Sequence, residues 1–323
     1  MTQDLLYLSR AQVEQLAPER SELRDAIAEA VRATAAGQLK FEPKTTLAYA
    51  TGHSFQCMPA LTSDSTGMGV ATIKWVSVVP STPGSKLDNI HSLICVNDLE
   101  TGQPLAIMDG NYITLVRTAA ISALAAQCMY RSNPVSIGFI GCGQQAREHL
   151  LAFRDLYPSL EQVFCFSRSE QSARKIADFA ANRSMKAQVS HHPDEVLETC
   201  DIVISTVPAA AGLKPYLDGR KLKPNALAVM VDLGRSWIAE GFNGFDFIAT
   251  DSLKQSKHPY DVEGNEIKSV QVAMDLESLI NHPLDDHGRK AFFFKGIASG
   301  DLAVAALIYE RAVSEKTGVL LAR

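Results

Sequence analysis

The sequence predicts an α/β protein in which a doubly wound parallel sheet is joined to a mixed α+β domain. After residue 134, short apolar strand candidates alternate with helical segments, as in a parallel sheet covered on both faces. Before residue 110, β-branched and apolar segments are broken by turn residues, which indicates a separate strand-rich domain. A chain of 323 residues is also long enough for two hydrophobic cores.

The first half of the chain is expected to hold one helix and then several strands. Apolar residues at helical spacing predict a surface helix over residues 20–36, which ends at a glycine. Strand candidates follow over 69–80 and 91–96, bounded by Thr-Pro-Gly, Asn-Asp and Thr-Gly turns. An alanine-rich helix over 117–130, with Thr114 placed to cap it, then connects to the second half.

The second half is expected to alternate strands with helices. A helix over 147–156 follows the first strand, and a last helix over 301–314 follows Gly300 and returns to the first domain. We therefore assign residues 1–131 and 299–323 to one domain and 132–298 to the other. The strand candidates lie over residues 135–140, 162–166, 201–206, 226–233 and 247–250.

Composition limits the classes of partner. Hydrophobic residues make up 46% of the chain and charged residues 21%, as in ordinary globular proteins. The net charge is −5 and no run of Lys or Arg exceeds a pair, so we expect no nucleic-acid partner. The six cysteines are scattered without a CxxC pair and predict reduced packing residues and no metal site. No signal-like start and no apolar run near the ~18 residues of a membrane span is apparent, which predicts a cytoplasmic protein without a membrane partner.

A glycine-rich turn joins the first strand of the second half to its helix. Residues 141–146 read Gly-Cys-Gly-Gln-Gln-Ala, which is the GxGxxA pattern between a strand and a helix. Gly141 permits the tight turn, Gly143 lets a pyrophosphate approach the backbone, and Ala146 lets helix and strand pack closely. The helix N-terminus offers unpaired N–H groups to the phosphates. The pattern predicts a Rossmann-type domain that binds a nicotinamide dinucleotide.

The end of the second strand indicates which dinucleotide. Ser167, Arg168 and Ser169 follow Phe166, where an NAD enzyme normally has an acidic residue for the ribose 2′-hydroxyl. A hydroxyl and a guanidinium suit a 2′-phosphate instead. We therefore expect NADP(H) as the preferred cofactor, with NAD(H) possible. Further cofactor contacts are assigned to Thr118, Gln144, Gln145, Thr206 and Pro208.

Lys74 is the candidate catalytic residue, because it lies in the otherwise nearly apolar segment 71–79. In a dry cleft beside another cation its pKa would fall, so that it acts as a general acid near neutral pH or polarises the reacting group. Two acidic residues allow either a functional or a structural interpretation. Asp301 fits the N-cap of the last helix as well as it fits a site, and Asp232 ends an apolar strand where ligands tend to bind.

Several spaced pieces of the sequence, covering nearly the whole chain, resemble the ornithine cyclodeaminase and mu-crystallin family. That family includes cyclodeaminases, alanine and arginine dehydrogenases, and cyclic ketimine reductases. The pieces are Met58-Pro59-Ala60, Ile73-Lys74 with Val78-Val79-Pro80, residues 102–108, Asp109-Gly110-Asn111 with Thr114, Arg117-Thr118-Ala119-Ala120, the turn at 141–146, and Gly300-Asp301-Leu302-Ala303.

The resemblance implies a homodimer whose first domain both dimerises and holds substrate, with the active site in the cleft between domains. It implies that Lys74 is the central lysine and that Arg117 binds the substrate α-carboxylate. Gln145 and Ala146 would lie at the cofactor phosphates, and we assign a substrate contact to Met58.

The sequence departs from the family pattern at two substrate positions. Lys44 stands where the family commonly has a second carboxylate-binding Arg, so a point charge replaces a planar fork. Ser236 aligns with the Asp that faces the substrate amine in cyclodeaminases. The lost carboxylate weakens the case for ornithine cyclodeamination.

These observations favour an NADP-dependent oxidoreductase that reduces a small imino acid, a cyclic ketimine such as pyrroline-2-carboxylate, or an oxo acid, to an L-amino acid. One alternative is a lyase of the ornithine cyclodeaminase type with tightly bound NAD, which deaminates or dehydrates an amino acid. Another alternative is a non-enzymatic, crystallin-like binding protein.

Overall fold

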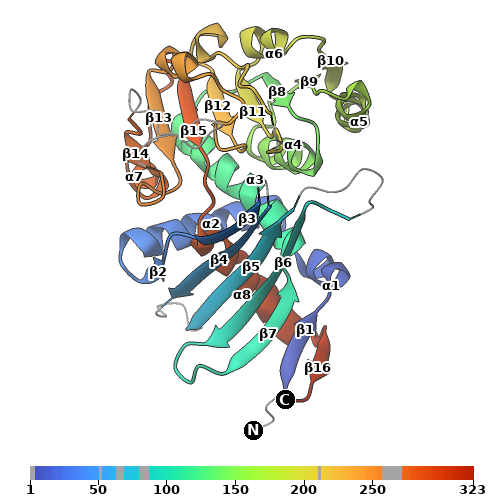
Figure 1. Ribbon diagram of the computed structural model, residues 1–323, viewed down its shortest axis with the longest axis vertical. Helices are drawn as coiled ribbons and strands as arrows, with labels where there is room; N and C mark the ends of the chain where they lie inside the picture. Colours follow the sequence, from blue (N-terminus) through green and yellow to red (C-terminus); the bar gives the residue numbers. More distant parts are fainter. Residues whose placement is uncertain (1–3, 51–52, 63–68, 80–86, 210–211, 257–270) are drawn as a thin grey trace. The chain divides into compact units, whose positions relative to one another are not determined.

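The computed structural model describes residues 4–50, 53–62, 69–79, 87–209, 212–256 and 271–323 (Figure 1). The chain divides into two compact units: unit 1 is Met1–Thr118 with Gly296–Arg323, and unit 2 is Ala119–Lys295. The sequence analysis placed the boundaries at residues 131 and 299. The first division falls earlier, inside helix α3 (Gly110–Met129), because this one continuous helix contributes residues to both units.

The described residues of unit 1 form a mixed sheet in the order β16-β1-β7-β6-β5-β4-β2, with β3 paired to β4 off this path. β1 pairs parallel with β7, and the other pairs are antiparallel. The strands are β1 (Leu5–Leu8), β2 (Leu39–Phe41), β3 (Thr45–Ala50), β4 (His53–Thr62), β5 (Val70–Val78), β6 (Ile90–Asp98), β7 (Pro104–Asp109) and β16 (Val319–Leu321).

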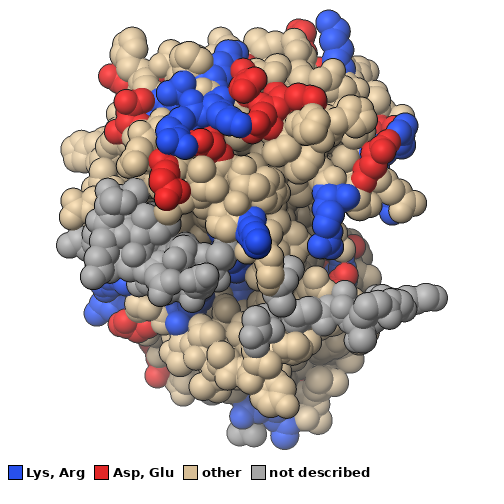
Figure 2. All heavy atoms as spheres, turned by 45° about the horizontal axis from the view of Figure 1, so that its top comes forward, with Lys and Arg blue, Asp and Glu red and all other residues tan. Residues whose placement is uncertain are grey.

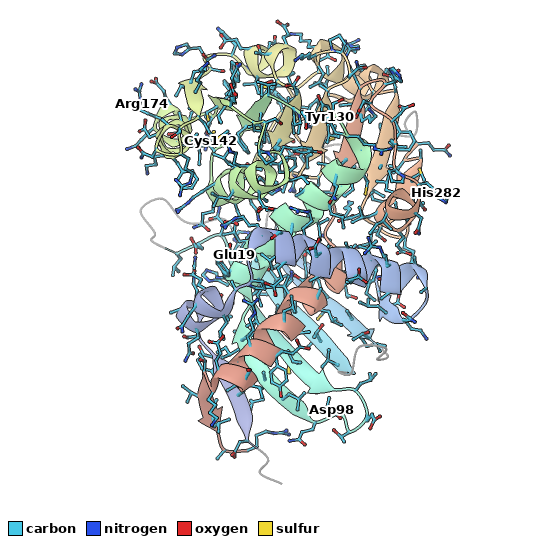
Figure 3. All side chains as sticks on the ribbon, turned by 180° about the vertical axis from the view of Figure 1, so that it is seen from behind. Glu19, Asp98, Tyr130, Cys142, Arg174 and His282 are labelled. Carbon is cyan, nitrogen blue, oxygen red and sulfur yellow. The ribbon has the colours of Figure 1, made fainter. Side chains whose placement is uncertain are left out.

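Helix α8 (Ala298–Glu315) lies across one face of this sheet, and α1 (Arg10–Leu16) and α2 (Arg20–Ala35) pack against α8 (Figure 3). Side chains along β5 alternate accordingly: Lys74 and Val76 are buried, whereas Ile73 and Trp75 are exposed on the opposite face. The last helix therefore packs on the first sheet. It begins at Ala298 rather than at residue 301, so Gly300 lies inside the helix.

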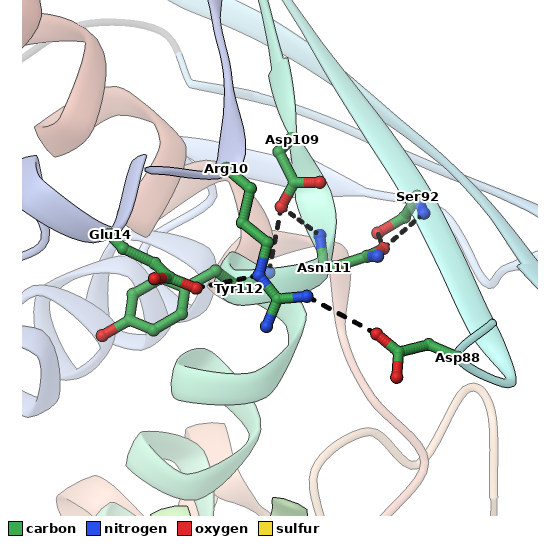
Figure 4. A network of polar contacts seen from close by, with 7 residues as sticks. All are labelled: Arg10, Glu14, Asp88, Ser92, Asp109, Asn111 and Tyr112. Atoms are coloured by element: carbon green, nitrogen blue, oxygen red, sulfur yellow. Dashed lines mark hydrogen bonds and ion pairs between the residues drawn. The ribbon is translucent and has the colours of Figure 1, made fainter. Parts of the chain in front are cut away.

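Helix α3 begins earlier than the sequence analysis predicted. Asp109 Oδ1 accepts hydrogen bonds from the backbone N–H groups of Asn111 at 3.1 Å and Tyr112 at 3.3 Å, so Asp109 satisfies the first donors of the helix (Figure 4). Thr114 lies inside the helix and does not cap it. A Cβ atom at Gly110 would lie only 2.6 Å from Ser92 Oγ, which explains the glycine after Asp109.

The described residues of unit 2 form a parallel sheet in the order β10-β9-β8-β11-β12-β15-β13-β14. Strand order reverses between β8 and β11, which is where ligands bind in open parallel sheets. The predicted Rossmann-type α/β class is confirmed. The strands are β8 (Ser136–Ile140), β9 (Gln162–Phe166), β10 (Lys186–Val189), β11 (Ile202–Ser205), β12 (Leu227–Met230), β13 (Phe247–Thr250), β14 (Met274–Asp275) and β15 (Lys290–Phe293).

Helices and short 3-10 turns connect these strands. Val203, Ala228, Phe292 and Phe293, on the central strands, are completely buried. The sequence analysis located five of these strands but not β10, β14 or β15. The connecting helices are α4 (Gln144–Leu156), α5 (Glu170–Ala181), α6 (Pro193–Thr199) and α7 (Leu276–Asn281), with 3-10 turns η1 (Gly219–Lys221) and η2 (Ala239–Gly244).

Among the described residues, one helix, α3, is long enough and apolar enough to cross a membrane, judged by length and composition alone. The sequence analysis found no run of that length. Because 78% of the most apolar stretch of α3 is buried inside the protein, α3 has the burial of a core helix.

Candidate active site

Lys74, Arg117 and Asp301 form a buried cluster in unit 1, which we call the Lys74 cluster. Lys74 Nζ donates a hydrogen bond to Asp301 Oδ1 at 2.7 Å, and Arg117 Nε donates to the same oxygen at 2.9 Å. The three side chains are 1%, 6% and 2% exposed, respectively. Because taking charges out of water is costly, such a cluster is stable only when the charges are paired with good geometry.

Distant parts of unit 1 bring the cluster together. Lys74 lies near the middle of β5 on the face covered by α8, and Met58 lies opposite it on β4, also buried. Asp301 lies in the first turn of α8, where the helix dipole favours a negative side chain. Arg117 comes from α3. Three residues that the sequence assigned to substrate binding or catalysis therefore meet at or beside the cluster.

The pKa of Lys74 is lowered from 10.5 to about 7. Burial is the largest cause, and the charge of Arg117 adds to it, whereas the charge and hydrogen bond of Asp301 oppose the shift. Lys44, between β2 and β3, lowers the pKa further, so its ammonium lies within electrostatic range of Lys74. A group with a pKa near 7 suits general acid catalysis at neutral pH.

Asp301 is the member of the cluster that the sequence analysis did not select. Its place at the expected start of the last helix suggested an N-cap, but the N-cap is Ile297 and Asp301 lies inside the first turn. One signal was available in the sequence, because Asp301 belongs to the Gly300-Asp301-Leu302-Ala303 piece of the family resemblance. Its partners were not visible there.

The glycine-rich turn of unit 2 leads from β8 into α4, and Cys142 within it is labelled in Figure 3. Gly141 has φ +87°, and a Cβ atom there would lie 2.9 Å from the carbonyl carbon of Thr206. Thr206 Oγ1 also donates to the Gly141 carbonyl at 2.7 Å. The turn is therefore held tightly against the end of β11 in a conformation that favours glycine.

The start of α4 has the features that a dinucleotide pyrophosphate needs. Gly143 is the N-cap, and a Cβ atom built there would meet nothing within 4 Å, so the space beside the backbone is open. Gln145 Oε1 is buried without a hydrogen-bond partner among the described residues. Gln144 is exposed and Ala146 is completely buried against the sheet. These residues fit a bound dinucleotide, with phosphates at the helix N-terminus.

The end of β9 presents the residues predicted to meet a 2′-phosphate. Ser167 is half-buried and Arg168 is exposed. Ser169 is the N-cap of α5, and its hydroxyl accepts a hydrogen bond from Ser172 N at 3.4 Å. Within the described ranges, Arg168 makes neither a hydrogen bond nor an ion pair. Its guanidinium is therefore available to an anionic ligand, and the Ser169 hydroxyl, which only accepts here, keeps its own proton to donate.

Other predicted contacts have defined places. Pro208 is exposed in the segment after β11, at the edge where the strand order reverses. Thr118 is buried in α3, and its hydroxyl donates to the Thr114 carbonyl at 2.7 Å. Such back-bonding within a helix uses the hydroxyl proton.

Ser236 is completely buried in unit 2, where its hydroxyl donates to Asp232 Oδ2. Asp232 Oδ1 accepts hydrogen bonds from Ser205 Oγ at 2.9 Å and Gly234 N at 3.2 Å, and Trp237 Nε1 donates to Ser205 Oγ at 3.0 Å. Burial raises the pKa of Asp232 to about 6, although the hydroxyl donors oppose the shift. The Ser236 hydroxyl is thus engaged with a buried carboxyl.

Acidic and basic side chains lie close together on the face shown in Figure 2. Exposed ion pairs of unit 2 include Lys221–Asp194 and Arg220–Asp218. A surface of mixed sign does not create the extended positive field that attracts a polyanion.

Known proteins are similar to this chain over most of its length. The chain is 31% identical to alanine dehydrogenase of Archaeoglobus fulgidus over 335 aligned residues, which cover 98% of this chain and 97% of that protein. It is 26% identical to a Delta(1)-pyrroline-2-carboxylate reductase of Bacillus cereus, over 78% of this chain and 80% of the relative.

A solved structure shows the same fold. The archaeal alanine dehydrogenase dimer with bound NAD superimposes with a TM-score of 0.87 at 28% identity, covering 98% of this chain and 99% of that one. The model of the ornithine cyclodeaminase/mu-crystallin family matches residues 4–316. The chain therefore belongs to the ornithine cyclodeaminase/mu-crystallin family.

Proposed function

We propose that this enzyme, an NAD(P)-dependent oxidoreductase acting on CH–NH or CH–NH2 groups, reduces a small imino acid to an L-amino acid. The favoured substrate is a cyclic ketimine such as pyrroline-2-carboxylate, and an oxo acid is the second candidate. The Lys74 cluster carries the proposal, because it combines a proton donor of pKa about 7 with a buried arginine. The names of the two relatives, alanine dehydrogenase and pyrroline-2-carboxylate reductase, support the same substrate class.

Each residue of the site has a task in this reaction. When bound, the nicotinamide supplies a hydride to the substrate carbon. Arg117 and Lys44 bind the substrate α-carboxylate, Arg117 through a planar fork and Lys44 as a point charge. Lys74 donates its Nζ proton to the substrate nitrogen. Asp301 holds Lys74 and Arg117 at 2.7 and 2.9 Å, which fixes proton donor and carboxylate clamp relative to each other.

The test is an assay of NADPH and, separately, NADH oxidation with cyclic imino acids, and with oxo acids plus ammonia or methylamine. We expect NADPH to be consumed with an imino acid. Lys74→Ala should abolish turnover while cofactor binding survives, and Lys175→Ala, an exposed lysine of α5, is the matched control. If neither cofactor is oxidised, but ornithine or hydroxyproline is converted with catalytic NAD, the chain is a lyase and the proposal fails.

We propose NADP(H) as the preferred cofactor, with Arg168 and Ser167 binding its 2′-phosphate. A hydrogen bond to a charged group contributes about 1.5–3 kcal/mol, so Arg168→Ala should weaken NADPH binding about tenfold or more and leave NADH binding nearly unchanged. Arg174→Ala, on the exposed side of α5, is the control. Fluorescence titration measures both affinities. Equal losses for NADPH and NADH would show that Arg168 does not contact the 2′-phosphate.

We propose that the enzyme is a homodimer formed through the face of the unit 1 sheet opposite α8. Phe55 and Trp75 stack there at 5.9 Å between ring centroids, and Ile73 and Leu93 are also exposed. An apolar patch on a sheet face fits a second copy of the same surface. Trp75→Glu should give a monomer by light scattering, whereas Val313→Glu, on α8, should remain a dimer. A dimeric Trp75→Glu protein would place the interface elsewhere.

We also propose a cytoplasmic location. All six cysteines are free, and four of them are buried. Such cysteines are typical of a reducing compartment. Fractionation of the source cells with an antibody to the protein tests this location.

A further inference from the structure

We propose that the second carboxylate oxygen of Asp301, Oδ2, binds the nitrogen of the substrate. This inference rests on the proposed function and adds to it the residue that orients the substrate nitrogen toward Lys74. Asp301 then has two tasks: Oδ1 positions the two cations of the cluster, and Oδ2 contacts the substrate directly.

The two oxygens of Asp301 have different surroundings. Oδ1 accepts from both Lys74 Nζ and Arg117 Nε. Oδ2 is buried and has no hydrogen-bond partner among the described residues. Leaving a buried acceptor unpaired is unfavourable, and more so when it is charged, so an oxygen of this kind is normally paired with water or a ligand.

The chemistry of the cluster selects a nitrogen as that ligand group. The substrate carboxylate would be repelled by the carboxylate of Asp301 and attracted to Arg117 and Lys44. The substrate nitrogen becomes a positively charged N–H donor when it takes the proton of Lys74, and a carboxylate oxygen is its natural acceptor. Because Asp301 contacts Lys74, a nitrogen held at Oδ2 lies beside the proton donor.

The charges and electrons of the step balance with NADPH as reductant. The lone pair of the imine nitrogen takes a proton from Lys74 Nζ, which becomes neutral. The hydride brings two electrons to the carbon and forms the new C–H bond, while the π pair of the C=N bond becomes the lone pair of the amine. Lys74 regains its proton from solvent. Asp301 neither gains nor loses a proton and stabilises the charged nitrogen throughout.

The test compares two ligands that differ only at the nitrogen. L-Proline and (S)-tetrahydrofuran-2-carboxylate have the same ring and carboxylate, but an ether oxygen replaces the ammonium group in the second. Their dissociation constants are measured by calorimetry on the full-length protein loaded with NADP⁺. Wild type should bind L-proline at least about tenfold more tightly, and Asp301→Asn should bring the two affinities within about threefold. Asp98→Asn, at an exposed turn of unit 1, should keep the wild-type ratio.

Two outcomes would overturn the inference. An unchanged ratio in Asp301→Asn would mean that Oδ2 is satisfied by water alone. Equal affinity of the wild-type protein for the two ligands would also overturn the inference, and this result does not depend on whether Asp301→Asn folds. Failure of the proposed function is a separate result, because it would appear as wild-type protein that oxidises neither NADPH nor NADH with any imino or oxo acid.

Discussion

Raising the pH should suppress the reductive reaction, because Lys74 must carry a proton to donate it. Its pKa is lowered from 10.5 to about 7 by burial and by the charge of Arg117. The protonated form is therefore complete well below pH 7 and is lost as the pH rises through 7. Oxidation of the L-amino acid needs the neutral form of Lys74, so that direction should show the opposite dependence and lose activity as the pH falls below 7.

The expected size of the effect follows from the shift. One pKa unit corresponds to about 1.4 kcal/mol, so the environment disfavours the ammonium of Lys74 by roughly 5 kcal/mol relative to water. At pH 9 only about one molecule in a hundred keeps the proton, whereas an ordinary lysine would remain almost fully charged. The plot of log kcat/KM against pH should bend at the pKa of Lys74, and we call this pH the break. Above the break, kcat/KM for reduction should fall about tenfold per pH unit.

The assay is the loss of NADPH absorbance with pyrroline-2-carboxylate, recorded from about pH 5.5 to 9.5 at constant ionic strength. Two variants move the break in opposite directions. Asp301→Asn removes interactions that raise the pKa of Lys74, so its break should lie lower, and Lys44→Gln removes a charge that lowers it, so its break should lie higher. Ionisation of the substrate is common to all three proteins, and differences between them report on the enzyme.

A particular result would refute this reasoning. If wild-type kcat/KM stays constant to pH 9, or if the break is the same in wild type, Asp301→Asn and Lys44→Gln, Lys74 is not the titrating proton donor. Cofactor affinity measured on the same samples serves as the control, because the glycine-rich turn lies in the other unit.

Three further predictions concern unit 2. Gly141→Ala should lower the free energy of unfolding in urea by about 1–3 kcal/mol and weaken cofactor binding, because φ is +87° and Cβ would approach Thr206 to 2.9 Å. Burial lowers the pKa of His149 to about 4, so the neutral side chain stabilises the fold above pH 6.5. About 3 kcal/mol of the free energy of unfolding is lost as the pH falls through 4. In urea titrations, the stability of His149→Gln should therefore depend less steeply on acid pH than that of wild type. Burial raises the pKa of Asp232 to about 6, so the contribution of this carboxyl to the free energy of unfolding is lost as the pH rises from 3.8 through 6. In the same titrations, Asp232→Asn should gain stability relative to wild type over that range.

The sequence predicted local features because their causes are local. The turn at residues 141–146 combines two glycines, an alanine and a following helix in adjacent positions, so its structure could be inferred without knowing the rest of the fold. Strands β9 and β13 were predicted with their observed bounds because they are short apolar runs between polar segments.

Where a local structure depends on contacts with other parts of the fold, the sequence was insufficient to predict it. Edge strand β10 alternates exposed and half-buried residues over only four positions, and it is a strand because it pairs with β9. The start of α3 was misplaced because Thr114 resembled a cap, whereas the Asp109 side chain satisfies the first donors.

The sequence by itself determined the class of fold, the dinucleotide turn and the candidacy of Lys74 and Arg117. Only the tertiary structure decided that both contact one oxygen of Asp301. Asp301 is 227 residues from Lys74 and 184 from Arg117, and no local pattern encodes contacts at that distance along the chain. The low pKa of Lys74 was decided in the same way, because burial and neighbouring charges exist only once β5, α3 and α8 have packed together.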